Sequence, residues 1–88
     1  MKVSNIQGPH GPVKNQFHIT DDDGTRYFQS YASIIARIKD GKVTLDAHYW
    51  DYSTTTGKYR NIFLGETKAE TLKKITSGVY TIENLNPS

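Results

Sequence analysis

Apolar and polar residues alternate with the period of a β-strand over residues 27–52, and the alternation is interrupted at Asp40-Gly41. Asp-Gly between two such runs is typical of a two-residue hairpin turn, because glycine accepts the positive φ that the turn needs. On one face this hairpin would pair Ile38 with Val43, Ala36 with Leu45, Ile34 with Ala47 and Ala32 with Tyr49. On the other it would pair Arg37 with Thr44, Ile35 with Asp46, Ser33 with His48 and Tyr31 with Trp50. A slip of one residue would mix these sets, so the pattern predicts this register.

Shorter alternating segments flank this hairpin. Residues 1–15 are expected to form an edge strand near residues 2–6 and then an irregular loop, because the segment GPHGP (residues 8–12) does not suit a central strand. Residues 16–20 alternate and are followed by Asp21-Asp22-Asp23-Gly24, which predicts another hairpin turn. Residues 79–85 predict a final strand, and residues 84–88 are expected to fray.

Two short helices are predicted within residues 53–78. The first would cover residues 55–64, after N-cap hydroxyls and before Gly65. The alternative is a hairpin through Thr56-Gly57, because a glycine inside a helix costs about 1 kcal/mol. The second helix would begin with a capping box from Thr67 to Glu70 and end at Gly78. Its apolar stripe would consist of Ala69, Leu72 and Ile75.

The predicted fold is therefore α+β: a single domain (residues 1–88) with a curved antiparallel sheet of three to five strands and two short helices on one face. Hydrophobic residues make up 35% of the chain, so the core must be thin, and aromatic rings should supply much of its area. On this argument Trp50 and Tyr31 belong to a second core layer, whereas the environment of Tyr52 is left open. The chain has no cysteine, no apolar leader and no run of membrane-spanning length, which favours a soluble cytoplasmic protein.

Residue patterns for catalysis or metal binding are poor. His10, His18 and His48 lack the spacing of a zinc site, and the consecutive acids of residues 21–23 lack the spacing of a calcium loop. Asp46 and Asp51 would lie on opposite faces of one strand, so they could not act as a pair. No phosphate-binding loop or nucleophile elbow occurs in the sequence. We therefore expect no enzyme activity, no metal and no cofactor.

Candidate binding residues lie near the end of the long hairpin and at its turn. Hydroxyl groups meet a predicted helix N-terminus there, next to cations, which suits an anion, although helix capping would use the same residues. The formal charge of +2 gives only mild support to nucleic-acid binding. The candidate residues are Tyr52, Thr54, Thr55, Lys58 and Arg60, together with Lys39 and Lys42 at the hairpin turn.

Three blocks of the sequence resemble a small family of unknown function from phages and mobile elements of Gram-positive bacteria. They are FQSYASIIA (residues 28–36), WDYSTTTGKYRNIFL (50–64) and ITSGVYTIENLN (75–86). The resemblance implies an accessory protein that acts inside a bacterial host and carries over no catalytic or binding residue. The leading hypothesis is a non-enzymatic protein that binds a host protein or nucleoprotein complex, for example a counter-defence inhibitor of the anti-CRISPR type. The alternatives are a nucleic-acid-binding protein and a structural or homo-oligomeric phage component using the edge strand near residues 2–6.

Overall fold

The computed structural model describes residues 1–87, which form one six-stranded sheet and two helices. Residue 88, part of the segment expected to fray, lies outside the described residues. The α+β prediction with two helices is confirmed, whereas the expected three to five strands are too few. The strands are β1 (Lys2–Gly8), β2 (Gly11–Thr20), β3 (Arg26–Ser30), β4 (Ser33–Lys39), β5 (Lys42–Asp46) and β6 (Thr81–Glu83), and the helices are α1 (Thr54–Leu64) and α2 (Lys68–Thr76).

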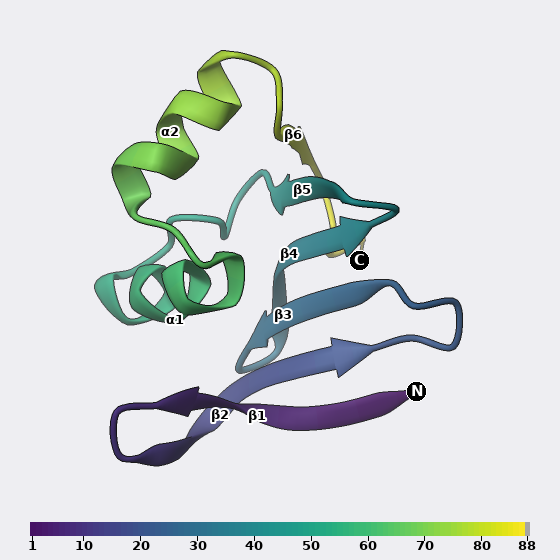
Figure 1. Cartoon of the computed structure of the whole chain (residues 1–88), viewed down its shortest axis with the longest axis vertical. Coiled ribbons are helices and arrows are strands. Elements are labelled where there is room, and N and C mark those ends of the chain that lie inside the picture. Colours follow the sequence, from purple (N-terminus) through teal and green to yellow (C-terminus); the bar gives the residue numbers. More distant parts are fainter. Residues whose placement is uncertain (88) are drawn as a thin grey trace.

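The strands follow one another across the sheet in chain order, from β1 at one edge to β6 at the other (Figure 1). Neighbouring pairs from β1 to β5 are antiparallel, as expected. The last pair is different, because β6 runs parallel to β5. A parallel neighbour needs a crossover connection, and α1 and α2 supply it between β5 and β6.

The predicted turn at Asp40-Gly41 is confirmed, with φ of 52° at Asp40 and 75° at Gly41. Lys39 faces Lys42, and Ala36 faces Leu45, so the register is correct near the turn. Further away it is wrong: the pairs Ile34–Ala47, Ala32–Tyr49, Ile35–Asp46, Ser33–His48 and Tyr31–Trp50 do not form, because β5 ends at Asp46 and residues 47–51 form a turn.

The expected long strand is in fact two strands with a turn at Tyr31-Ala32 between them. Where β4 meets β3, the pairing changes from Phe28–Ala36 to Gln29–Ile34, so Ile35 is an extra residue in a β-bulge. A bulge interrupts the strict alternation of a strand, and Ile35 and Ala36 are accordingly both buried. The sequence pattern of period two did not reveal this interruption.

The residues from 1 to 20 form a hairpin whose turn takes only Pro9 and His10. The expected loop over residues 8–12 is therefore mostly strand. The pairing of β1 with β2 shifts between Asn5 and Gln7, which accommodates the extra residues of β2. Asn15 has a φ of 66° in this irregular part of β2.

Both helices form at the predicted places, and the hairpin alternative for residues 55–64 is wrong. Ser53 caps α1 by accepting the Thr56 N–H, and Gly65 ends it with a φ of 69°. The capping box of α2 joins Thr67 and Glu70 as predicted. The predicted apolar stripe of α2 is wrong in part, because Leu72 is 43% exposed and Ala69 is exposed, while Ile75 packs against the core.

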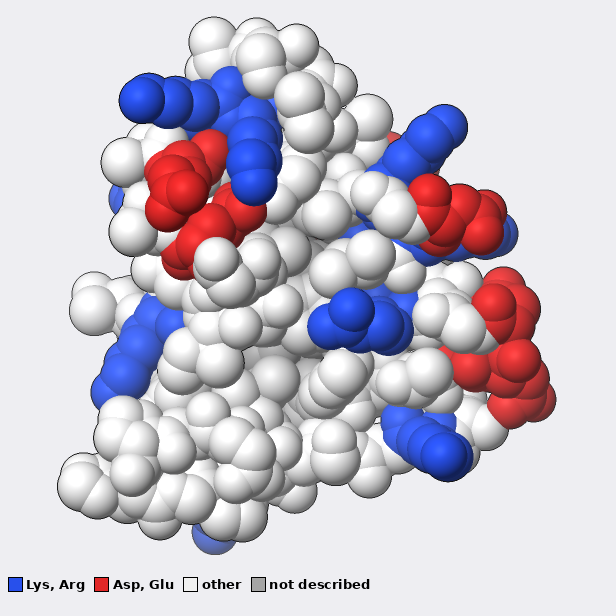
Figure 2. All heavy atoms as spheres, viewed as in Figure 1, with Lys and Arg blue, Asp and Glu red and all other residues white. Residues whose placement is uncertain are grey.

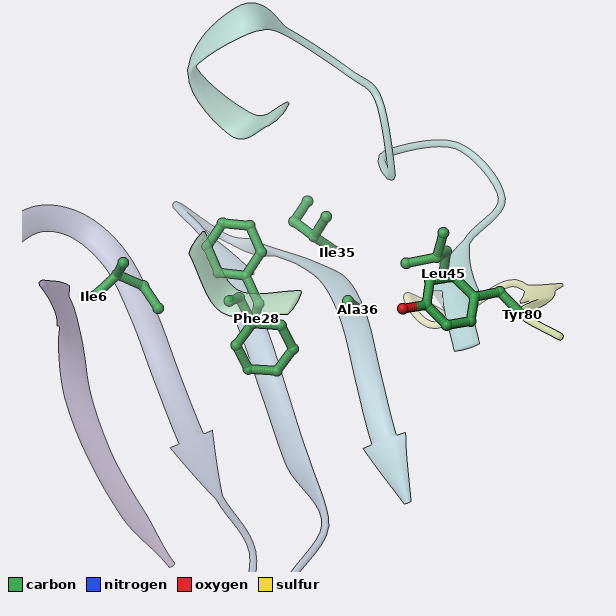
Figure 3. Close-up of a cluster of buried hydrophobic side chains, with 7 residues drawn as sticks. Ile6, Phe28, Ile35, Ala36, Leu45 and Tyr80 are labelled. Atoms are coloured by element: carbon green, nitrogen blue, oxygen red, sulfur yellow. The ribbon is translucent and has the colours of Figure 1, made fainter. Parts of the chain in front are cut away.

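The hydrophobic core lies between one face of the sheet and the helices. Figure 3 shows its side chains following one another across the strands, from Ile6 on β1 through Phe28 and Ala36 to Leu45. Phe63 of α1 stacks on Phe28 with ring centroids 5.9 Å apart, and Tyr80 closes the core near β5. Six of the seven core residues thus lie on the sheet or α1, so α2 contributes little apolar area.

The segment after β6 is held by side chains, contrary to the expected fraying. Asp46, which is fully buried, accepts the N–H of Leu85 at 2.7 Å with one oxygen and those of His48 and Tyr49 with the other. The side-chain amide of Asn86 bonds both backbone groups of Ile34. These contacts fix residues 84–86 beside the end of β5, where β4 has lost its strand partner.

Candidate binding site

A cleft of about 500 Å³ opens where the β3–β4 turn, the segment after β5 and the start of α1 come together. This volume is within the range of about 300–1,000 Å³ that is typical of ligand sites. Its lining consists of aromatic, small and hydroxyl-bearing side chains, with no charged residue among those described: Ser30, Tyr31, Ala32, Ser33, Ile35, Tyr49, Tyr52, Ser53, Thr55 and Thr56. We call it the tyrosine cleft.

Two of the three tyrosines are largely exposed. Tyr31 is 63% exposed and Tyr52 is 69% exposed, whereas Tyr49 is partly buried and packs against the core. The rings of Tyr49 and Tyr52 meet edge to face, with centroids 5.4 Å apart. Tyr49 therefore supports the ring of Tyr52, and the two rings form an aromatic surface in the cleft.

The backbone of Tyr31 has a φ of 54°, which is uncommon for a bulky residue. Its N–H donates to the carbonyl oxygen of Asn15 at 2.7 Å, which helps to hold the turn. A glycine or asparagine would adopt this conformation at lower cost, so the tyrosine here is not explained by the turn itself.

The floor of the cleft is a small network of hydroxyl groups. Ser30 and Thr56 are buried and their hydroxyl oxygens lie 3.4 Å apart, while the Ser53 hydroxyl donates to Thr56 at 3.1 Å. Ser53 also accepts the Thr56 N–H, so it caps the helix. The capping interpretation is therefore confirmed for the Ser53 hydroxyl, and these hydroxyls do not by themselves indicate an anion site.

The predicted binding residues do not form one site. Tyr52 and Thr55 line the tyrosine cleft, whereas Thr54 and Lys58 line a neighbouring hollow beside Asp51 and Lys68. Lys39 and Lys42 lie at the β4–β5 turn, in a different hollow. Figure 2 shows basic and acidic side chains interspersed over the face that it draws.

Arg60 is buried, with 1% of the residue exposed, so its predicted role in binding is not supported by its position. Its guanidinium donates to the Trp50 carbonyl at 2.6 Å, to Asp51 at 3.3 Å and to Asn61 at 3.0 Å. The guanidinium carbon lies 5.1 Å from the centre of the Trp50 ring. Arg60 therefore stabilises the turn that follows β5, and Trp50 is partly buried as expected.

Asp51 links this buried arginine to the surface. It also accepts a hydrogen bond from Lys68 at 2.7 Å. The Lys68 bond is the largest cause that holds the pKa of Asp51 below its ordinary value; burial opposes this effect and Arg60 adds to it. Asp51 is therefore a structural carboxylate that joins the start of α2 to the turn before α1.

Sequence reasoning missed Tyr49 as a site residue and placed Tyr31 in the core. Both errors follow from the assumed long hairpin, which put Tyr31 in the middle of a strand. The missed signal was the three small residues around it, Ser30, Ala32 and Ser33, which suit a turn.

Residues 1–87 can also be compared with the requirements of a metal site and of a membrane-spanning helix. Their acidic and histidine side chains contain no group of three that could hold a metal ion. Among the same residues, no helix is long and apolar enough to cross a membrane.

Fold and site together define a small α+β protein with an open mixed sheet and an uncharged, tyrosine-lined cleft. A family of unknown function, DUF8033, matches residues 1–78, and the chain belongs to this family. No curated protein and no solved structure matches the chain.

Proposed function

We propose that the protein is a non-enzymatic binding protein that recognises a host macromolecule, in the first instance a protein, through the tyrosine cleft. The observation that carries this proposal is the pair Tyr31 and Tyr52, which are mostly exposed and both line an uncharged cleft. Tyrosine is enriched at the energetic centres of protein interfaces, because its ring offers a large contact area and its hydroxyl a hydrogen bond.

The chemistry of the lining supports this choice. Tyrosine together with serine is the combination that antibody binding loops use, since the ring loses little conformational entropy and the small hydroxyls adapt to the partner. The strained φ of Tyr31 adds support, because strain of this kind tends to gather at functional positions. The uncharged lining favours a neutral surface of the partner rather than a phosphate backbone.

The resemblance to phage and mobile-element sequences supplies the biological setting of the proposal. A small protein without catalytic groups can inhibit a larger machine by covering a surface on it. A counter-defence role, such as inhibition of a CRISPR nuclease complex in the host cytoplasm, has this form.

The test has two stages. The tagged protein captures partners from a bacterial host lysate, and the captured protein is then purified and its affinity measured by calorimetry. Because truncating an interface hot spot costs about 2 kcal/mol or more, Tyr31→Ala and Tyr52→Ala should each weaken binding by at least about tenfold.

Leu72→Ala is the matched control. Leu72 is also an exposed apolar residue, at 43%, but it lies on α2 away from the cleft. It should leave the affinity unchanged. Equal affinities for the wild type and both tyrosine variants would show that the cleft is not the binding site.

A further inference from the structure

The sheet face that points away from the helices carries a second, chemically different surface. The ring of His18 faces the helices, because its centroid lies 5.5 Å from that of Phe63 on α1. Neighbouring residues of a strand point to opposite faces, so Phe17 and Ile19, on either side of His18, point away from the helices. Phe28 likewise stacks on Phe63, so its neighbours Tyr27 and Gln29 also point away from α1. Phe17, Ile19 and Tyr27 remain partly exposed there.

Cations continue this face across β4 and β5. Arg37 lies directly opposite Tyr27 in the sheet, and Lys39 follows two residues later on the same face. Lys42 faces Lys39 across the turn, and both lysines are exposed. Aromatic rings on β2 and β3 are thus followed by three cations on β4 and β5. We call these five residues the aromatic–cationic track: Phe17, Tyr27, Arg37, Lys39 and Lys42.

Acidic groups compensate these cations only in part. Arg37 donates to Glu83 at 3.4 Å, a long contact whose carboxylate is 57% exposed. The Thr44 hydroxyl accepts a second bond from Arg37 at 3.3 Å. The Nε atom of Arg37 is buried and makes no hydrogen bond within the described residues. An exposed pair of this kind contributes little to stability, so a stronger anion can displace Glu83 at little cost.

A hollow of about 540 Å³ lies beside the cations, with β5, the β4–β5 turn and the residues before β6 as its walls. Arg37, Lys39 and Lys42 all line it, together with the hydroxyls of Thr44 and Thr81 and the carboxylates of Asp40 and Glu83. The three cations outnumber the two carboxylates, and with the hydroxyl groups they form a surface that can follow a chain of phosphates.

We propose that the aromatic–cationic track binds single-stranded nucleic acid. The bases stack on Phe17 and Tyr27, and the phosphates lie along Arg37, Lys39 and Lys42. Charge complementarity selects a polyanion, and the partly exposed rings select one that carries flat, uncharged groups. A duplex keeps its bases stacked inside and cannot use the rings. This site is independent of the proposed function, because the track lies on the sheet face that the helices leave uncovered, whereas the tyrosine cleft lies beside the start of α1.

The test measures binding of the full chain to fluorescent 12-mers of deoxythymidine and of uridine, to a duplex of the same length, and to polyglutamate. With three phosphate contacts, the logarithm of the affinity for the single strands should fall with the logarithm of salt concentration with a slope of about −2. An abasic strand should bind more weakly than an intact strand, because it lacks the bases. The two single strands separate a DNA from an RNA preference.

The double variant Lys39→Glu/Lys42→Glu should weaken binding by about tenfold or more. It should also make the salt dependence shallower, with a slope of less than about 1 in magnitude. Lys58→Glu/Lys73→Glu makes the same charge change at exposed lysines of α1 and α2, and should leave binding close to that of the wild type. Tyr27→Leu keeps an apolar side chain and should reduce the preference for intact over abasic strands.

Several outcomes would overturn the proposal. Equal binding of duplex and single strand, or of polyglutamate and single strand, would assign the track to duplex DNA or to an acidic protein. Equal losses in the two double variants would show a general charge effect. No binding to either single strand at low salt would remove nucleic acid altogether. Circular dichroism of every variant confirms that folding is retained.

Discussion

Asn86 and Ile34 are 52 residues apart in the chain, yet the side chain of one completes the backbone bonding of the other. The Ile34 N–H donates to Asn86 Oδ1 at 2.7 Å, and Asn86 Nδ2 donates to the Ile34 carbonyl at 2.8 Å. A single amide thus replaces a strand partner for β4 at the point where β5 has ended.

Removing this amide should destabilise the protein. Asn86→Ala leaves two backbone groups of a partly buried segment without partners, each of which costs about 1–3 kcal/mol when buried. We expect the free energy of unfolding in urea to fall by about 2 kcal/mol. Asn86→Asp keeps the acceptor for Ile34 and loses the donor, so it should have an intermediate effect. Equal stability of wild type and Asn86→Ala would contradict this role.

Two buried carboxylates predict a loss of stability in acid. Burial acts to raise the pKa of Glu66, but the hydrogen bonds from Lys74, Thr71 and Tyr80 together outweigh it and hold the pKa below its ordinary value. Burial also acts to raise the pKa of Asp46, but hydrogen bonds outweigh this effect and hold the pKa below its ordinary value. The donors belong to Leu85, Tyr49, Asn86 and His48.

Because both pKa values are lower in the folded state, the stabilisation is present above the unfolded pKa of about 4 and is lost as pH falls through the folded values. Thermal unfolding between pH 7 and pH 2 should show the melting temperature falling below about pH 5. Glu66→Gln should make the melting temperature depend less steeply on pH. Glu70→Gln, at an exposed capping position, should change this slope much less. An unchanged slope in Glu66→Gln would refute this explanation.

Arg60 and Lys58 offer a paired test of structural and surface cations on α1. Arg60→Met removes three hydrogen bonds and leaves Asp51 with only Lys68 as its cation. The Trp50 carbonyl then loses its donor, which costs about 1–3 kcal/mol for a buried group, so this variant should be clearly destabilised and its Trp50 fluorescence should change. Lys58→Met, at an exposed position, should keep the stability within about 0.5 kcal/mol of the wild type. Comparable losses in the two variants would contradict the structural role of Arg60.

Gly57 and Gly65 should respond in opposite ways to alanine. Gly57 lies inside α1, and a Cβ there would meet Arg60 and Asp51 at ordinary contact distances of 3.6–3.8 Å. Gly57→Ala should therefore stabilise the protein by about 0.5–1 kcal/mol. Gly65 has a φ of 69°, so Gly65→Ala should destabilise it by about 1 kcal/mol. Urea titrations of both variants decide this, and a destabilised Gly57→Ala would show that the space beside Arg60 is tighter than the distances indicate.

Local signals in the sequence predicted local structure well. Asp40-Gly41, the capping box of Thr67 and Glu70, and the stop at Gly65 depend on backbone geometry within a few residues, and each forms as expected. The errors concern positions where contacts between residues far apart in the sequence determine the backbone conformation. Tyr31 takes a positive φ that its residue type disfavours, and its N–H is fixed by Asn15, sixteen positions earlier in the chain.

The candidate site was harder to predict than the fold for the same reason. The tyrosine cleft depends on three segments that meet only because the strand ends at Ser30 rather than continuing. Arg60 seemed accessible in the sequence because charged residues are seldom fully buried. Its burial depends on the Trp50 carbonyl and Asp51, both of which belong to a turn that the assumed register had drawn as strand.

The parallel pairing of β6 has a consequence for the order of folding. The strands β1 to β5 join neighbours in sequence, whereas the contact of Thr44 with Thr81 closes a loop of 37 residues. Long loops close at a higher entropic cost, so we expect the sheet from β1 to β5 to form in the transition state and β6 with residues 84–86 to dock afterwards. Stopped-flow measurements should then find that Asn86→Ala accelerates unfolding and leaves the folding rate almost unchanged. The last residues to dock would also be the first to detach.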